Sequence, residues 1–419
     1  MALLRYLRLL TATTMTLIAL TVAASTAVVA DPAASTSSSV DMRLPDSPHA
    51  DALMEWWYAN AHITTNAGKH LAVVCAFFKI GTEGAPPMMG MPAMRPGHYL
   101  IYAVTDLGTG TQRAYSFADA PMVGGLKTLL MFTGGRDPQS ASLLNILLKG
   151  KLPEPHQFIR GPVGIADSPL LVHYGDAGSF AAIDGVNSYR LRLGGKDTID
   201  FTFKSEKPVM KVGGKGETGL VKPTDMYYYS LTRCDVTGNV NGAAVKTGQG
   251  WIDHQWGASW TTQKAGWDWW GAQLDDGTDI LFFQQRNLTT GKTFFPLATF
   301  MDKDGVQTVT RNIVFRPVPG ASWRSPRTKS KYPLAWDVSF PDQNLNLRIT
   351  ADVKAQEMPV LTPGGDIWEG SCSVIGLSSM GTRMNPGESG MPIHSRGYIV
   401  KGTAYMELVG YSRARKQGR

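Results

Sequence analysis

Tryptophan residues gather in one part of this sequence. Six of the eleven lie within twenty residues, namely Trp251, Trp256, Trp260, Trp267, Trp269 and Trp270. A tryptophan ring buries a large apolar surface and carries an N–H donor that needs a partner. Such a cluster either fills a core between two sheets or lines a pocket for an extended ligand. We therefore predict an aromatic pocket around residues 250–257, with a purely structural aromatic core as the alternative.

The segment 251–256 combines these rings with polar side chains that can transfer protons. Alternate side chains of a strand share a face, so His254 and Trp256 point to one side. Asp253 and Gln255 point to the other side together with Trp251. An imidazole beside an indole in a pocket could have a functional role. A histidine satisfied within a β core is the structural alternative.

The next predicted strand, residues 267–274, supplies two further faces. Trp267 and Trp269 share one of them, while Asp268 and Trp270 share the other. We expect catalysis from three residues: His254, Asp268 and Asp253. We expect substrate contacts from a second set: Trp256, Trp267, Trp269, Trp270, Trp57 and Glu55.

Other recognisable chemistries have no motif in the sequence. A Gly-x-Ser-x-Gly elbow, a His-Glu-x-x-His pair and a phosphate loop are all missing. Residues 275–278 resemble part of a calcium loop, but a hairpin turn explains them. His62, His254 and Glu55 could offer metal ligands, yet their spacing does not support a metal site. We expect no metal and no cofactor.

Composition and charge restrict the class of protein. With 43% hydrophobic and 18% charged residues, the 419-residue chain can bury sizeable cores in two or three domains. The net charge of +7 is scattered, without a basic stripe between aromatics, which argues against nucleic-acid binding. Cys75, Cys234 and Cys372 are too few for a disulfide scaffold or a zinc cage, although Cys234 and Cys372 could form one bridge.

The first thirty residues have the parts of an export signal. Two arginines precede an apolar stretch, and small residues lead up to Ala30. We expect residues 1–30 to be a cleaved signal peptide and the protein to be secreted or periplasmic, with an uncleaved membrane anchor as the alternative. A flexible polar leader at 31–43 and a basic tail at 412–419 complete the predicted ends of the chain.

The rest of the chain predicts an all-β fold. Short apolar runs between glycine-rich turn signals form two successive sets of antiparallel strands. We place an N-terminal domain at residues 44–243 and a C-terminal domain at 244–411. The apolar segment 122–152 suits a short helical insertion, which could plug one end of a barrel, cover a pocket as a lid or contact lipid. The oligomeric state is not predicted.

Five blocks of sequence resemble the lipocalin-like family of carotenoid 1,2-hydratase and AttH proteins. In chain order they are Glu55-Trp56-Trp57-Tyr58, residues 251–257, residues 266–277, Trp368-Glu369-Gly370 and residues 405–411. The resemblance implies two lipocalin-like (calycin) antiparallel β-barrel domains in tandem. It also implies a range of functions, because the family includes secreted proteins labelled predicted hydrolases, hydratases of isoprenoid double bonds and distant cyclases of polyene chains.

Hydration of an isoprenoid double bond, which the resemblance favours, requires an acid that protonates carbon and aromatic rings that stabilise the resulting cation. In the carotenoid hydratases the acid is expected on the strand after the Asp-Gly turn, but residues 280–286 contain none. Another acid would have to serve: Asp253, Asp268, Glu55 or Glu369.

We predict a hydro-lyase or cyclase that acts on the C=C bonds of an apolar isoprenoid or polyene. A non-catalytic carrier of a hydrophobic ligand and a secreted hydrolase are the alternatives. In each case the expected partner is a small hydrophobic molecule, and peripheral contact with a membrane through the helical insertion stays open.

Overall fold

The structure is a computed structural model that describes residues 44–82, 95–133, 138–258, 265–362, 365, 367–378 and 398–411. The predicted signal peptide, leader and basic tail lie outside the described residues, as does Trp260. None of the described helices is long and apolar enough to cross a membrane.

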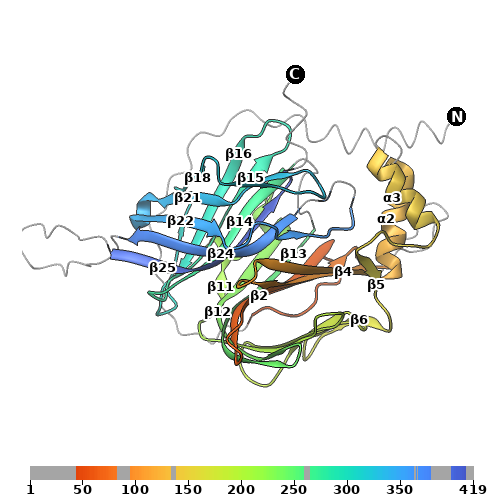
Figure 1. Ribbon diagram of the computed structural model, residues 1–419, viewed down its shortest axis with the longest axis horizontal. Helices are drawn as coiled ribbons and strands as arrows, with labels where there is room; N and C mark the ends of the chain where they lie inside the picture. Colours follow the sequence, from red (N-terminus) through yellow and green to blue (C-terminus); the bar gives the residue numbers. More distant parts are fainter. Residues whose placement is uncertain are drawn as a thin grey trace, which may run out of the picture. The chain divides into compact units, whose positions relative to one another are not determined.

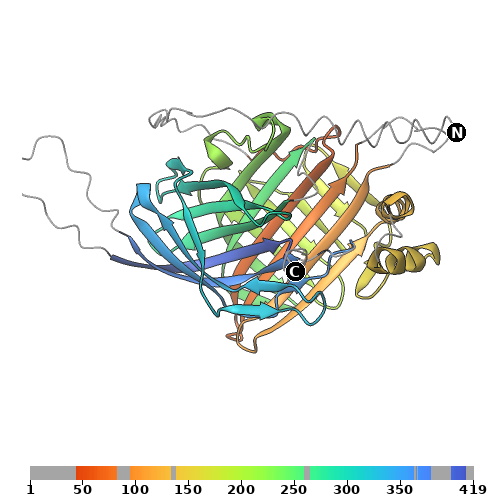
Figure 2. The same ribbon diagram turned by 90° about the horizontal axis from the view of Figure 1, so that it is seen from above.

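The first of two large sheets has thirteen strands and curls into a half-barrel (Figures 1 and 2). Its neighbours are antiparallel except for β4 and β5. The strands lie in the order β5 (His156–Phe158), β4 (Thr111–Ala118), β3 (Gly97–Asp106), β2 (His70–Ile80), β1 (Met54–Thr65), β13 (Ala243–Gly257), β12 (Met226–Val240), β10 (Ile199–Ser205), β9 (Ser188–Leu193), β8 (Gly178–Ala182), β7 (Leu171–Tyr174) and β6 (Val163–Ala166), with β11 (Met210–Lys211) paired to β12.

The second sheet has ten strands and is curled as well (Figure 1). Its order is β17 (Gln307–Thr310), β16 (Thr293–Met301), β15 (Asp279–Asn287), β14 (Ala265–Leu274), β25 (Tyr398–Val409), β24 (Ile367–Ser378), β22 (Leu345–Ala351), β21 (Ala335–Phe340) and β18 (Val314–Pro317), with β23 (Glu357–Met358) paired to β24. Besides two helices, the other described elements are a hairpin of β19 (Ser322–Arg324) and β20 (Lys331–Pro333) and three single 3-10 turns, η1 (Val212–Gly214), η2 (Pro223–Asp225) and η3 (Pro341–Gln343). The nearly all-β architecture confirms the predicted fold class.

A tight turn keeps β13 in the first sheet. Asn241 and Gly242 join β12 to β13, and their φ angles of 51° and 77° are those of a two-residue Asn-Gly hairpin. The chain therefore folds straight back, so that β13 pairs with β12 on one side and with β1 on the other. The predicted domain limit at residue 243 lies at this turn, whereas the change of sheet follows Gly257. The assignment of each sheet to a separate domain stays a prediction.

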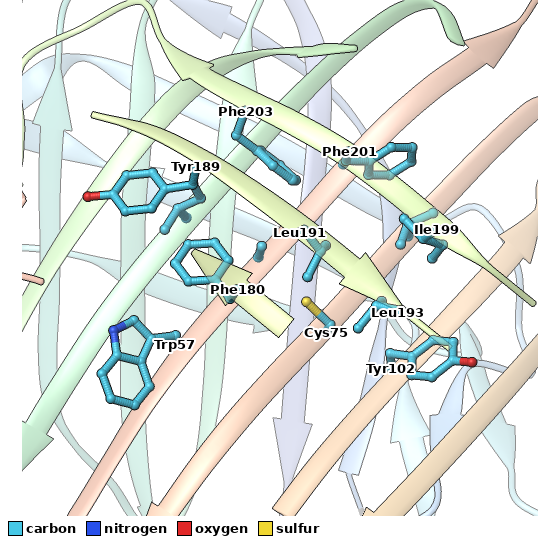
Figure 3. Close-up of a cluster of buried hydrophobic side chains, with 14 of the residues drawn as sticks. Trp57, Cys75, Tyr102, Phe180, Tyr189, Leu191, Leu193, Ile199, Phe201 and Phe203 are labelled. Carbon is cyan, nitrogen blue, oxygen red and sulfur yellow. The ribbon is translucent and has the colours of Figure 1, made fainter. Parts of the chain in front are cut away.

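Apolar side chains form one cluster inside the curl of each sheet. In the first sheet, the cluster contains Trp57 of β1 together with Phe180 of β8 and Phe201 of β10 (Figure 3). In the second sheet, Trp270 and Trp336 pack edge to face at 5.2 Å between ring centres. Full burial of a large apolar side chain contributes about 1.5–3 kcal/mol, so these two clusters stabilise the two curls.

A third apolar cluster joins the outer faces of the two sheets. It contains Tyr58 and Trp251 from the first sheet and Trp269 and Tyr405 from the second. Because the central strands of the first sheet are covered on both faces, residues 71–77 are buried throughout rather than alternating. This shared layer is the one that positions the candidate site.

Two helices, α2 (Ala120–Thr133) and α3 (Pro138–Leu148), form the insertion and lie beside β4 and β5 (Figure 1). Asp119 caps α2 by accepting a hydrogen bond of 2.8 Å from the backbone N–H of Met122. The same carboxylate contacts the His98 ring at 2.7 Å. A side chain at Gly97 would place its Cβ 2.6 Å from the Met122 Cα, so glycine permits the close approach of α2 to β3. The predicted helical insertion is confirmed, and it consists of two helices.

The cysteines do not pair. Cys75, Cys234 and Cys372 are all free and buried, so the Cys234–Cys372 bridge that the sequence allows does not form. Cys234 belongs to the first sheet, whereas Cys372 belongs to the second. Burial raises the pKa of the Cys75 thiol to about 12, which keeps it protonated and unreactive.

Candidate functional site

A cavity of about 650 Å³ lies where the outer faces of the two sheets meet. Strands β1, β2 and β3 line one side, strands β14, β15, β24 and β25 line the other, and α2 contributes leucine side chains. The lining is mainly apolar and includes the rings of Trp56, Trp267 and Trp269. Pockets for small molecules typically have volumes of roughly 300–1,000 Å³, so this cavity can hold a small hydrophobic molecule.

Two glutamates face each other inside this cavity. Glu369 of β24 and Glu407 of β25 are direct partners in the antiparallel ladder, and both line the cavity. Directly opposed side chains start from Cβ atoms about 4.5–5.5 Å apart. Glu369 is only 5% exposed, whereas Glu407 keeps some accessible surface toward the cavity. Two carboxyl groups at this separation repel each other when both are ionised, so the pair tends to retain a proton.

Burial changes the proton affinity of both glutamates. Loss of water raises the pKa of Glu407 to about 7, and a hydrogen bond with Trp267 opposes part of that rise. Loss of water, and then the charge of Glu407, raises the pKa of Glu369 well above its ordinary value. The Tyr58 hydroxyl donates a hydrogen bond of 2.8 Å to Glu369 Oε1. Of the two, Glu369 therefore retains its proton more readily, and Glu407 is the member that ionises first.

A third acid, Asp253 of β13, lines the same cavity but is held differently. Its Oδ2 accepts a hydrogen bond of 2.8 Å from the Tyr228 hydroxyl. Its Oδ1 accepts two more, at 2.5 Å from Ser230 Oγ and at 2.7 Å from Trp251 Nε1. Burial raises the pKa of Asp253 to about 6 although these donors lower it. Asp253 is thus a fixed, mostly ionised carboxylate at neutral pH.

One cavity residue offers an unused polar atom. Gln285 Oε1 is buried and has no hydrogen-bond partner among the described residues. Gln285 of β15 lines the cavity, so a hydroxyl or amide donor of a bound molecule could satisfy this oxygen. The site therefore combines a large apolar surface with a few polar groups that can orient a ligand.

The opposite face of β13 belongs to the interior of the first sheet. His254 is fully buried there, stacks on Trp57 at 4.8 Å between ring centres, and contacts Glu55 Oε1 through Nε2 at 3.0 Å. Trp256 stacks on His49 at 4.0 Å. The predicted alternation along this strand is observed, but none of these five side chains lines the cavity.

The Glu55 carboxylate is the centre of a charge-compensated network. Burial would raise the pKa of Glu55, but hydrogen bonds from His254 and His49 lower it to about 2. Lys79 Nζ lies 3.6 Å from Glu55 Oε2 and is itself almost completely buried. His49, and not His62, lies with Glu55 and His254 in a group whose ligand atoms are within 4.8 Å of one another. These atoms could surround a metal ion, yet the ammonium of Lys79 already balances the carboxylate.

Asp268 lies on the inner face of the second sheet. Its carboxylate accepts hydrogen bonds of 3.0 Å from Gln284 Nε2 and 2.7 Å from the Tyr411 hydroxyl. Arg286 Nη1 lies 3.2 Å from the same carboxylate. Burial raises the pKa of Asp268, and the Arg286 charge opposes the rise. Asp268 therefore anchors β14 to β15 and to the end of β25, away from the cavity.

The structure divides the predicted site residues among three layers. Those that line the cavity are Asp253, Trp267 and Trp269. Those inside the first sheet are Glu55, Trp57, His254 and Trp256, and those inside the second are Asp268 and Trp270. The tryptophan cluster is thus partly pocket and partly core, so both interpretations of it apply to different rings.

Sequence reasoning missed the partnership of Glu369 with Glu407. From the sequence, Glu369 is one of four candidate acids, and Glu407 has no assigned role within the block 405–411. Alternation along each strand sets both glutamates on the same face as Ser371 and Tyr405. A glutamate inside each short apolar block is the feature of the sequence that could indicate the site. The pairing of β24 with β25 is evident only from the structure.

Comparisons with known proteins agree with this architecture. The model of the AttH-like family matches residues 156–411. The crystal structure of an AttH candidate from Nitrosomonas europaea has 23% identity and a TM-score of 0.62, covering 90% of this chain and 100% of that one. The crystal structure of kievitone hydratase from Nectria haematococca has 14% identity and a TM-score of 0.52, covering 87% and 90%. No curated protein matches the chain. At these identities the two structures establish the lipocalin-like fold.

Proposed function

This chain belongs to the AttH-like family, whose model covers more than half of it, and from that premise we propose that it is a hydro-lyase or cyclase. The substrate class is an apolar isoprenoid or polyene that carries C=C bonds and binds in the cavity between the sheets. One observation carries the proposal, namely the opposed pair Glu369 and Glu407 in a cavity with a mainly apolar lining. A similar fold in a protein named as a hydratase supports the reaction class.

The first step is protonation of an alkene carbon. Glu369 is the donor, because burial and the charge of Glu407 raise its pKa and favour the neutral acid, which can lie against an apolar chain. A C–H bond forms, the C=C π bond breaks, and Glu369 becomes a carboxylate beside a carbocation. Trp267 and Trp269 line the same cavity, and an aromatic ring whose face lies against a cation contributes about 0.5–2 kcal/mol.

The second step consumes the cation. In hydration, a water oxygen forms the new C–O bond, and its released proton passes to the ionised Glu407 or to Asp253. In cyclisation, a second C=C bond of the same chain attacks the cation, and loss of a neighbouring proton to the same acceptors restores an alkene. When Glu407 takes the proton, the pair ends with the single proton with which it began. Transfer from Glu407 to Glu369 then restores the starting state.

A non-catalytic carrier is the second candidate function. The mainly apolar lining of the cavity favours it, since retention of a hydrophobic molecule needs only this surface. The hydrolase alternative has weaker support. Histidines, which activate most serine nucleophiles, do not occur among the described residues that line the cavity.

Conversion of defined probes tests the proposal. The purified protein is incubated with lycopene, squalene or geranylgeraniol, and products that have gained or lost water or formed rings are sought by mass spectrometry. We expect wild-type protein to form such a product, Glu369→Gln to lose it while tryptophan quenching still reports binding, and the control Asp268→Asn, on the other face of the second sheet, to retain it. If the wild-type protein binds a probe without converting it, the enzyme proposal is wrong and the carrier function takes its place.

A further inference from the structure

Two buried oxygen atoms at the cavity have no hydrogen-bond partner in the part of the chain that the structure describes. They are Gln285 Oε1, on β15, and Thr218 Oγ1, in the segment between η1 and η2. Thr218 is only 8% exposed. A polar atom that is buried without a partner is destabilising, and most buried polar atoms in proteins have one. Two such atoms at one cavity therefore indicate a ligand that supplies the missing partners.

Contacts between the sheets place both oxygen atoms toward the same end of the cavity. The Thr232 hydroxyl of β12 donates a hydrogen bond of 2.9 Å to Asp279 Oδ2 of β15. From this contact β15 runs on to Gln285 and β12 runs back to Met226, and both of these residues line the cavity. The backbone N–H of Thr218 donates a hydrogen bond of 2.9 Å to the Met226 carbonyl. We call this part of the cavity, with Gln285 and Thr218, the polar end.

The acid pair lies some way from the polar end. Glu407 is opposite Trp269, and Trp269 is opposite Phe283, on three neighbouring strands. Gln285 is two residues beyond Phe283 on the same face of β15. A strand spacing of about 4.8 Å and a rise of about 3.3 Å per residue give about 12 Å between the Cα atoms of Glu407 and Gln285. A chain molecule can thus have a polar group at the polar end and a double bond at the acids.

The lining of the cavity restricts the chemistry of that polar group. Three acids line the cavity, whereas lysine, arginine and histidine do not occur among the described residues that line it. A phosphate or carboxylate group would meet no opposite charge there. An ionised carboxylate also has no proton for Gln285 Oε1, which can only accept. A hydroxyl both donates and accepts, so one neutral group can serve Gln285 and the Thr218 hydroxyl together.

We propose that the substrate is a long-chain alcohol whose hydroxyl binds at the polar end. The hydroxyl donates to Gln285 Oε1 and accepts from Thr218 Oγ1, while a double bond of the same molecule lies at Glu369 and Glu407. This inference rests on the proposed function for the position of the double bond. It makes free isoprenoid alcohols, and not hydrocarbons or phosphate esters, the preferred ligands, with Gln285 and Thr218 as the residues that determine this specificity.

Two probes that differ by one methyl group test the polar end. Geranylgeraniol can donate and accept a hydrogen bond, whereas its methyl ether can only accept. In tryptophan-quenching titrations we expect wild-type protein to bind the alcohol about tenfold more tightly than the ether. Gln285→Leu should abolish this difference, because the acceptor is gone. Equal wild-type affinities would overturn the proposal, and so would a difference that persists in Gln285→Leu, since the bulk of the methyl group would then explain it.

A second variant and a matched control complete the titrations. Thr218→Val should weaken binding of both probes by a similar factor, because the ether oxygen also accepts a hydrogen bond from Thr218. Gln343→Leu is the control, since Gln343 Oε1 is likewise buried without a partner among the described residues but does not line the cavity. It should leave both affinities unchanged. Unchanged affinities in Thr218→Val, or equal losses in Gln343→Leu and Gln285→Leu, would contradict the proposal.

Urea denaturation of the ligand-free protein separates binding from folding. Gln285→Leu removes an unpaired acceptor, so its midpoint should equal or exceed that of the wild type. A lower midpoint together with the lost affinity would assign Gln285 to the fold and refute the proposal.

The alcohol site and the proposed reaction fail separately. Glu369→Gln should keep the preference for the alcohol over the ether, because its carboxyl group is not part of the polar end. A wild-type protein that prefers the alcohol but converts neither probe would refute the reaction and leave the alcohol site intact. Equal conversion of squalene and geranylgeraniol, without a preference in binding, would support the reaction and refute the alcohol site.

Discussion

Glu55 and Glu369 are both buried carboxyl groups on central strands, yet their surroundings are opposite. Glu55, inside the first sheet, receives hydrogen bonds from two histidines and lies near the Lys79 ammonium, so its pKa falls to about 2. Glu369, between the sheets, faces another glutamate, so burial and that charge raise its pKa. A buried acid whose charge is balanced stabilises a fold, whereas one kept neutral in a cavity is available for proton transfer. The comparison separates a structural network from a candidate site.

The largest expected effect is on conversion. Glu369→Gln removes the transferable proton while keeping shape and one hydrogen-bond acceptor, so kcat/KM should fall by roughly 10²–10⁴-fold. His254→Gln changes the balanced network and should leave kcat/KM of the folded protein within about threefold. Both are measured with the converted probe, using the folded fraction from circular dichroism to correct the concentration. An equal fall for His254→Gln would mean that the network of Glu55 takes part in the chemistry.

For the free energy of unfolding, we expect the larger effect at Glu55 and the smaller one at Glu369. Glu55→Gln leaves the Lys79 charge buried without its carboxylate, and breaking a buried pair in this way costs about 3–5 kcal/mol of unfolding free energy. Glu369→Gln replaces a neutral acid by a neutral amide and should cost less than about 1 kcal/mol. Urea denaturation at pH 7 measures both. Similar losses for the two variants would show that the carboxyl groups are not electrostatically different.

Glu407 in the cavity and Glu55 in the charge-balanced network should make the unfolding free energy depend on pH in opposite directions. Glu407 has a folded pKa of about 7 against an ordinary value of 4.5, so the folded state binds more protons between these values. Unfolding free energy should therefore fall as pH rises from 4.5 to 7, by about 2–3 kcal/mol for this group. Glu55 has a folded pKa of about 2, so its contribution is present above 4.5 and is lost as pH falls toward 2.

Two variants identify the groups that cause these two changes of unfolding free energy with pH. Glu407→Gln should flatten the decline of the urea midpoint between pH 4.5 and 7, and Glu55→Gln should flatten the decline below pH 4.5. A decline between pH 4.5 and 7 that persists unchanged in Glu407→Gln would have to come from another group, and Asp253, whose pKa is raised to about 6, is the next to test.

Local patterns in the sequence account for much of the fold and for the sharing of faces. Alternation correctly groups His254 with Trp256 and Asp253 with Gln255, because every strand has this period. Alternation does not say which of the two groups lines a cavity. That depends on how the second sheet packs against β13, and one of its central strands, β25, lies far from β13 in the chain. For the same reason Glu369 and Glu407 are recognised as a pair only once β24 and β25 are known to be neighbours.

The smallest expected effect concerns two adjacent tryptophans that alternation sends to different layers. Trp269 lines the cavity and Trp270 lies in the core of the second sheet, stacked on Phe282 at 5.1 Å. Trp269→Phe should weaken binding of an apolar probe by a few fold, on the scale of about 0.5–1.5 kcal/mol for an aromatic contact. Trp270→Phe should leave probe affinity unchanged and lower unfolding free energy by about 1–2 kcal/mol through the void it creates. Fluorescence titration measures probe affinity, and urea denaturation measures unfolding free energy, for both variants. If Trp270→Phe lost as much affinity as Trp269→Phe, the ligand would lie inside the second sheet instead of between the two sheets.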